Sequence, residues 1–268
     1  MAVSSEGTEK RITTLLDEKI RKKTEQVFPD GIKSILANIN LMRRATDPKN
    51  LNPDVTETAY VGAIFLLFSR NRELIHFSTV CLLHGGYSSV KVLVRAAYEG
   101  GLYMRLFNKM PNLAGEWFKD TEKFRKKWGI DTAQQELFQK GSRLYKSHRK
   151  LYGELCKYAH PSSEGWREQR YGSKVLWRPW FKAENAEESI GLIFYVIVQT
   201  WLAFLATIEK QIGKDFLPEI YTRLQNNGGM LARHFVVYTK TEDIIPSQEP
   251  EKAKSSMKNW PLTTSRTS

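Results

Sequence analysis

The chain has few of the residues that build metal sites and disulfide frameworks. Its 268 residues include only two cysteines, Cys81 and Cys156, and five histidines. There is no Cys-x-x-Cys pair and no pair of histidines at helical ligand spacing, so the sequence predicts neither a metal nor another cofactor. Both cysteines fall in apolar segments, which is typical of buried free thiols in a reducing cytosol.

Glycine-rich phosphate loops and leader segments are missing from the pattern as well. Gly85-Gly86 and Gly100-Gly101 are glycine pairs without the strand–turn–helix setting that a P-loop or a dinucleotide-binding motif requires. Because no hydrolase elbow occurs either, nucleotide hydrolysis and hydride transfer are not expected. Residues 4–23 are polar and charged, so we expect no signal peptide and a cytoplasmic protein.

Acidic residues are scarce relative to basic ones. The 29 Asp and Glu face 41 Lys and Arg, which gives a formal net charge of +12. The excess is uneven, because residues 119–178 contain 15 basic and 7 acidic residues, a balance of +8. This clustering favours a surface that binds a polyanion, with nucleic acid ahead of an acidic membrane. The alternative is a basic protein that its charge keeps in solution.

Apolar residues recur with helical periodicity along most of the chain. We therefore predict an all-α, multi-helix bundle of seven or eight helices. The expected helices cover residues 8–28, a short segment ending near 44, 54–83, 88–108, 112–128, 132–159, 185–208 and 216–224. Asp54 with Glu57 and Asn185 with Glu188 form capping boxes at two of the predicted starts, and Ser88 caps a third.

Composition divides the chain into three parts. We predict charged N-terminal helices that pack on the core over residues 1–53, a main helical domain over 54–226, and a flexible tail over 227–268 that is rich in Ser, Thr, Lys and Pro. Within the main domain, residues 162–181 are the least helical and alternate tryptophan with arginine. They predict a long, basic and aromatic loop or an irregular hairpin.

One segment is unusually apolar. Ile190–Ile208 contains 19 residues without a charge, which is long enough to cross a bilayer. Gln199 and Thr200 lie at its centre, and the other predicted helices are amphipathic. A helix surrounded by such helices is also apolar all round, so we interpret this segment as a very apolar central core helix. A membrane segment is the alternative.

Arg95 and Glu99 lie inside another apolar helical segment. Because they are four residues apart, with Lys91 extending the row, we expect them to touch and to be at least half buried. His160 ends a later helix, where the helix dipole favours the imidazolium. As catalytic residues, Arg95 would hold phosphate, Glu99 would orient Arg95 or accept a proton, and His160 would be the acid or base. Alternatively, the three form a buried structural network.

A second group of candidates is Arg70-Asn71-Arg72-Glu73-Leu74-Ile75-His76. It resembles the Arg-x(4 to 6)-His motif of HEPN domains, helical modules that include metal-independent ribonucleases. The resemblance implies that Arg70 stabilises phosphate oxygens, Asn71 orients the site and His76 moves a proton, facing a second copy of the domain. On a straight helix Arg70 and His76 are about 120° out of line, so this role requires a local bend.

A broader resemblance covers Leu93-Val94-Arg95-Ala96-Ala97-Tyr98-Glu99 and the segment from Tyr152 to Ser162, which contains Tyr158-Ala159-His160-Pro161. Together they are similar to a family of bacterial helical proteins with no assigned function, plausibly distant relatives of HEPN domains. This resemblance implies that Arg95, Glu99 and His160 converge in space. It brings no activity with it.

Basic and aromatic residues in the later half of the chain suit single-stranded RNA, whose bases stack on rings while cations follow the backbone. The candidate nucleic-acid-binding residues are Arg143, Lys150, Trp166, Arg167, Arg170, Trp177 and Arg178. We therefore predict an RNA-directed cytosolic protein, in its most specific form a ribonuclease of a toxin or antiviral defence system. The alternative is a non-enzymatic binding or regulatory protein. Expected partners are RNA, a second copy of the chain or another protein.

Overall fold

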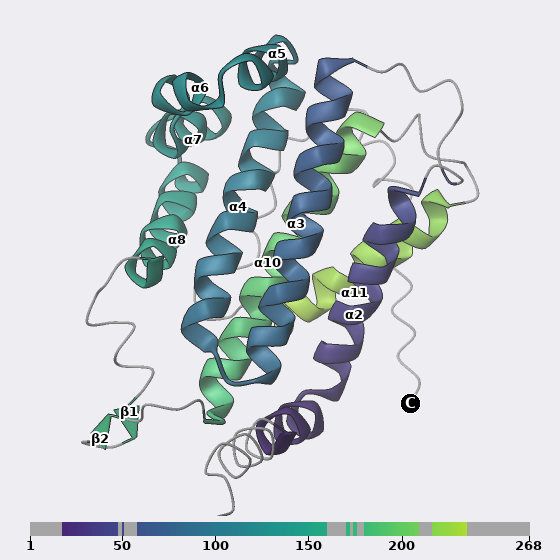
Figure 1. Ribbon diagram of the computed structural model, residues 1–268, viewed down its shortest axis with the longest axis vertical. Coiled ribbons are helices and arrows are strands. Elements are labelled where there is room, and N and C mark those ends of the chain that lie inside the picture. Colours follow the sequence, from purple (N-terminus) through teal and green to yellow (C-terminus); the bar gives the residue numbers. More distant parts are fainter. Residues whose placement is uncertain are drawn as a thin grey trace, which may run out of the picture.

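The computed structural model describes residues 18–47, 50, 58–159, 170–171, 174–175, 180–208 and 216–234. These residues form an all-α bundle of many helices with one short hairpin beside it, which confirms the predicted fold class (Figure 1). Three long helices lie at its centre, namely α3 (Ala59–Leu83), α4 (Tyr87–Lys109) and α10 (Ala183–Ile208). Each of the three packs against the other two.

The remaining elements surround this centre. On one side a helix over residues 18–27 leads into α2 (Pro29–Ala45), which packs on α11 (Leu217–His234) and α10. On the other side α7 (Ile130–Phe138) and α8 (Arg143–Ala159) pack on α4, and α5 (Asn112–Lys119) and α6 (Thr121–Lys127) lie near its end (Figure 1). Beyond α8, β1 (Arg170–Tyr171) pairs antiparallel with β2 (Lys174–Val175).

Two glycines produce the turn between α3 and α4. Gly85 adopts a positive φ of 74°, a conformation that glycine reaches without steric cost. The N–H of Gly86 donates to the carbonyl of Cys81 at 2.8 Å, so the end of α3 is capped by its own backbone. The predicted end of this helix at residue 83 is therefore confirmed, and α4 returns antiparallel to α3.

The three central helices meet at the side chain of Asn71, which is fully buried. Its Nδ2 donates to the carbonyl oxygen of Ala97 on α4 and to Oγ1 of Thr200 on α10, both at 3.0 Å. Gly100 of α4 makes room for this amide, because a Cβ at that position would lie 2.2 Å from Asn71 Oδ1. The Asn71 side chain thus joins α3, α4 and α10 at the point where Gly100, which has no side chain, lets α3 approach α4 closely.

Helix α10 is the core helix that the sequence predicts. Its largest fully buried side chains include Tyr195, Phe194, Trp201 and Phe204. The polar residue Thr200 at the centre of the helix is satisfied in the core, because its hydroxyl accepts the hydrogen bond from Asn71 of α3. By length and composition alone this helix also passes as a membrane span, but 83% of its most apolar 18-residue window is buried inside the protein, as in a soluble core helix.

The predicted start of the first central helix is wrong. Helix α3 begins at Ala59, and Thr58 is its N-cap, with a hydroxyl that accepts the N–H of Val61 at 3.2 Å. The predicted cap, Asp54, and its partner Glu57 lie outside the described residues. A threonine hydroxyl satisfies the orphan N–H groups of a first turn as well as a carboxylate does, so residue type alone did not select between the two positions.

Two further helix starts lie before their predicted caps. The first backbone bond of α4 runs from Val90 N to Gly86 O at 3.1 Å, so Ser88 lies within the first turn. For α10 the N–H of Ala186 donates to Lys182 O at 3.0 Å, which places Asn185 inside the helix. Both starts are corrected by backbone hydrogen bonds whose acceptors lie two and three residues before the candidate caps.

Two predicted helices are each divided in the structure. Asp120 is extended, and its carboxylate accepts the N–H of Lys123 at 2.9 Å, so the segment 112–128 becomes α5 and α6. Positive φ angles at Gln139 and Gly141 separate α7 from α8 within the segment 132–159. Helix α11, in contrast, continues to His234, past its predicted end at 224 and past the predicted domain boundary at 226.

Replacing Gly100 by Ala should destabilise the protein. The new Cβ must displace the buried amide of Asn71, which two hydrogen bonds hold in place. We expect the free energy of unfolding to fall by about 1–3 kcal/mol, measured by chemical denaturation. In an Asn71→Ala background the same substitution should cost much less, because the clashing atoms are absent.

Gly153 provides the matched control. It lies in α8 with nothing within 4 Å of a built Cβ, so Gly153→Ala should raise the free energy of unfolding by up to about 1 kcal/mol through helix propensity. Equal effects of Gly100→Ala and Gly153→Ala would contradict the close approach of α3 and α4.

Candidate functional site

The candidate site is a seam of polar side chains between α4 and α8. Lys91, Arg95 and Glu99 are spaced four residues apart on α4 and therefore lie in one row along the helix. Across from this row α8 presents Tyr152 and Tyr158. The ammonium of Lys91 lies 4.1 Å from the ring centre of Tyr158, and the guanidinium of Arg95 lies 5.3 Å from that of Tyr152.

Arg95, Glu99 and Tyr152 form a closed triangle of hydrogen bonds. Arg95 Nε donates to Glu99 Oε1 at 3.0 Å, and Arg95 Nη2 donates to the hydroxyl of Tyr152 at 3.2 Å. The Tyr152 hydroxyl in turn donates to the same Glu99 oxygen at 2.8 Å. The side chains of Arg95 and Glu99 are only 23% and 17% exposed, so the prediction of a largely buried pair is confirmed.

The electrostatics of this triangle favour its present protonation. Burial raises the pKa of the Tyr152 hydroxyl, and the carboxylate of Glu99 raises it further. Burial opposes the charge on Arg95, but the hydrogen bond that Arg95 donates to Tyr152 and the neighbouring negative charge outweigh it and raise the pKa of the guanidinium. Arg125 of α6 adds a second cation 4.0 Å from Glu99. The triangle therefore holds a charged arginine and a neutral tyrosine at physiological pH.

Lys91 is buried more deeply than Arg95. Its side chain is 3% exposed, and its Nζ lies 2.8 Å from Oε2 of Glu188 on α10. A buried ammonium requires a partner of opposite charge, and the carboxylate from the central helix supplies one. Through Glu188 and the ring of Tyr158, Lys91 connects α4 with both α10 and α8.

The sequence identified Arg95 and Glu99 but missed Tyr152. His160, the predicted third member, lies outside the described residues. Lys157 makes an exposed pair with Glu154 at 2.8 Å. Tyr152 could have been predicted to face α4, because it follows the buried His148 by four residues and so lies on the same side of α8.

The structure does not bring the HEPN-like candidates together. Arg70 and His76 are exposed on α3, whereas Asn71 points into the core and binds Ala97 and Thr200. Helix α3 runs without a break from Ala59 to Leu83. The amide of Asn71 therefore lies on its core side, whereas Arg70 lies on its solvent-exposed side, and the amide cannot reach a substrate bound at Arg70. Asn71, predicted to orient this site, is fully buried in the core.

Two predicted nucleic-acid-binding residues, Arg143 and Lys150, belong to a row of basic residues on α8. Arg143, Lys146, Lys150 and Lys157 are all exposed and follow one another at intervals close to whole helical turns. Within the part of the chain that the structure describes, neither Lys146 nor Lys150 has an ion-pair partner. Two exposed lysines next to each other on one helix face can therefore neutralise an anion without first breaking an internal contact.

The other predicted nucleic-acid-binding residues follow α8 in the sequence. Arg170 belongs to β1, so the backbone forms the predicted irregular hairpin at this point. Trp166, Arg167, Trp177 and Arg178 lie outside the described residues.

A buried polar network on the inner side of α8 escaped the sequence analysis. The hydroxyl of Tyr98 lies 2.9 Å from Nδ1 of His148, and that of Tyr195 lies 3.3 Å from the same atom. Gln134 donates to the Tyr98 hydroxyl at 2.8 Å, and the His148 ring stacks on Phe138 with 3.9 Å between centres. His148 follows the spacing of the apolar residues of α8, which predicts burial but not its polar partners.

His148 is neutral in this network. Burial, together with the smaller effect of the Arg105 charge, lowers the pKa of its imidazole from 6.5 to about 3. Burial likewise raises the pKa of the hydroxyls of Tyr98 and Tyr195. Among the described residues the Nε2 atom of His148 has no hydrogen-bond partner, so the protonated ring would carry an unsatisfied donor in the core.

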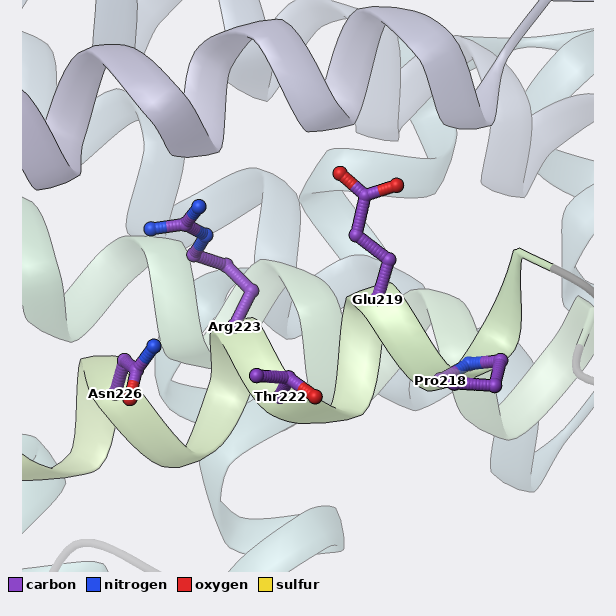
Figure 2. Close-up of a pocket in the computed structure, with 5 residues that line it drawn as sticks. All are labelled: Pro218, Glu219, Thr222, Arg223 and Asn226. Carbon is purple, nitrogen blue, oxygen red and sulfur yellow. The ribbon is translucent and has the colours of Figure 1, made fainter.

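A surface pocket beside α11 is lined by none of the candidate site residues. It is lined by Pro218, Glu219, Thr222, Arg223 and Asn226, and Figure 2 shows Glu219 and Arg223 pointing toward the neighbouring helix. Glu219 is already paired with Arg44 of α2 at 2.7 Å. Among the described residues, no group of three or more His, Cys, Asp and Glu side chains is placed to hold a metal ion.

Comparisons with protein-family models, with curated proteins and with solved structures returned no match. The resemblances to HEPN domains and to bacterial helical proteins therefore stay predictions.

Replacing Tyr152 by Phe should loosen the seam between α4 and α8. The change removes the hydroxyl that bonds both Arg95 and Glu99 but keeps the ring. We expect the free energy of unfolding to fall by about 1–2 kcal/mol. Tyr158→Phe is the matched control on the same helix, and because the Tyr158 contact with Lys91 is made by the ring, its effect should stay within about 0.5 kcal/mol. Similar losses in both variants would contradict the triangle.

Acid should destabilise the protein through His148. Its folded pKa of about 3 lies below the unfolded value of 6.5, so the unfolded chain binds the proton first as the pH falls. Between pH 7 and pH 5 this one group should lower the free energy of unfolding by about 2 kcal/mol. His148→Phe should remove that share of the pH dependence, whereas His76→Gln, at an exposed position, should leave it unchanged. Parallel pH profiles for wild type and His148→Phe would refute the assignment.

Proposed function

We propose that this protein binds single-stranded RNA through the exposed basic face of α8, defined by Arg143, Lys146, Lys150 and Lys157. The observation that carries the proposal is the pair Lys146 and Lys150, which are exposed, adjacent and without an ion-pair partner in the described part of the chain. Phosphate contacts by such cations supply most of the sequence-independent affinity for nucleic acid.

The sequence around α8 supports RNA over other polyanions. The chain that follows α8 carries Trp166, Arg167, Trp177 and Arg178, residue types that stack on unpaired bases while the lysines follow the phosphates. The hairpin of β1 and β2 adds Arg170 and Lys174 to the same stretch. A face of lysines alone would attract any polyanion, but the tryptophan and arginine that follow in the sequence favour a ligand with exposed bases.

In this account Arg95, Glu99 and Tyr152 are structural rather than catalytic. All three satisfy one another, and the raised pKa values of Arg95 and Tyr152 oppose proton transfer at physiological pH. Ribonuclease activity, as in a toxin or antiviral defence protein, would require one of these groups to leave the triangle and reach a phosphate. The proposed role of the triangle is to hold α8 against α4, so that the basic face points outward.

The test is the affinity for a fluorescein-labelled single-stranded RNA of mixed sequence, measured by anisotropy over a range of salt concentrations. Lys146→Gln with Lys150→Gln should weaken binding roughly tenfold at moderate salt. The slope of log affinity against log salt should also become shallower by about 1.4, the value for two lost phosphate contacts on a single strand.

The control is Lys23→Gln with Lys33→Gln, which removes the same charge from exposed positions on the opposite side of the bundle. Its affinity should stay within about twofold of wild type. Equal weakening by both pairs would show that overall charge, not the face of α8, attracts the RNA. The same samples in EDTA, separated on a denaturing gel, should contain intact RNA, and cleavage products would favour the ribonuclease hypothesis.

A further inference from the structure

The outer face of α3 exposes more apolar surface than a solvated helix face normally does. In the described part of the chain, three of the seven exposed large hydrophobic side chains lie on this one helix. Leu66 is 52% exposed, Phe77 is 53% exposed and Val80 is 40% exposed. We call these three residues, together with Arg70 and Glu73 between them, the outer face of α3. In Figure 1 this helix lies in front of α10.

The spacing of this face is that of a helix–helix seam. Its five positions follow one another at intervals of four, three, four and three residues, the pattern by which one helix packs along another. Phe118 of α5, 50% exposed, extends the apolar surface beyond Leu66, because its ring lies 3.9 Å from a Cβ built at Gly62. The seam therefore runs along most of α3.

The four seam residues from Leu66 to Phe77 have a symmetric order by type, namely apolar, charged, charged and apolar. About a midpoint between residues 71 and 72, Leu66 is related to Phe77 and Arg70 is related to Glu73. The same operation takes Val80 to position 63, next to Gly62, where the ring of Phe118 lies. A two-fold axis through this midpoint would place apolar groups opposite apolar groups and each arginine opposite a glutamate, which is the requirement for an interface between identical chains.

Charge selects the antiparallel arrangement. A parallel pairing would place Arg70 opposite Arg70 and Glu73 opposite Glu73, with repulsion at the centre of the seam. In the antiparallel pairing each Arg70 meets the Glu73 of the second copy. Glu73 remains half exposed although it bonds Arg72 of its own chain, so one carboxylate can accept both guanidinium groups.

We propose that this protein forms a homodimer through the outer face of α3, with the two α3 helices antiparallel. Leu66 packs on Phe77 of the second copy, Val80 packs on Phe118, and two Arg70–Glu73 pairs fix the register. The basic face of α8 lies on a different helix, so the dimer presents two RNA-binding faces. The proposal holds whether or not α8 binds RNA.

A charge-swap cycle tests this interface on the full-length protein by sedimentation equilibrium. Wild type should be dimeric, and Arg70→Glu and Glu73→Arg should each raise the dissociation constant at least roughly tenfold, because like charges then face each other. The double variant R70E/E73R should recover most of the affinity, because the opposite charges meet again. A double variant no better than either single variant would overturn the proposal, as would a monomeric wild type at its highest soluble concentration.

Cysteine cross-linking tests the register independently. Within one chain, positions 66 and 77 are about 16 Å apart along the helix, too far for a disulfide. A mixture of the Leu66→Cys and Phe77→Cys proteins should therefore form a disulfide-linked dimer under oxidation. Either protein alone, and wild type with its native Cys81 and Cys156, should not. Equal cross-linking in all samples, or none in the mixture, would overturn the antiparallel pairing.

Discussion

The close approach of α3 to α4 is the constraint on which the rest of the structure depends. Gly100 has no side chain to separate the helices, and the amide of Asn71 occupies the space. That amide also bonds Thr200, so a single side chain fixes the relative positions of α3, α4 and α10. Apolar surfaces slide against one another at little cost, whereas a buried amide loses hydrogen bonds when it moves, so this contact gives the apolar core a defined register.

With two sides of α4 taken by α3 and α10, its polar row faces α8. Buried charges there are stabilised by partners from three helices: Arg95 by Glu99 and Tyr152, and Lys91 by Glu188. These contacts orient α8 and leave its lysines exposed on the opposite side. The polar seam and the basic face are thus two sides of one amphipathic helix, which links the packing of the core to the proposed function.

Helical periodicity was sufficient to predict the fold class, the central helix and the burial of Arg95, because these follow from the type and spacing of residues. It was insufficient for features that depend on a partner distant in sequence. Tyr152 became part of the triangle only because α8 docks on α4, and His148 became a buried network residue for the same reason. Asp120 was predicted to lie inside a helix, because the extended backbone that interrupts the helix at this residue does not follow from residue type. Asn71, predicted as a catalytic residue, lies in the core because α3 presents that side to Gly100.

The measurement that tests the central claim most directly is lysine footprinting of the wild-type protein with and without a single-stranded RNA. Acylation of each lysine would be quantified by mass spectrometry. If α8 carries the binding face, Lys146 and Lys150 should lose reactivity in the presence of RNA, while the exposed lysines Lys23 and Lys33 keep theirs. Uniform protection of all four, or protection confined to the latter two, would contradict the account.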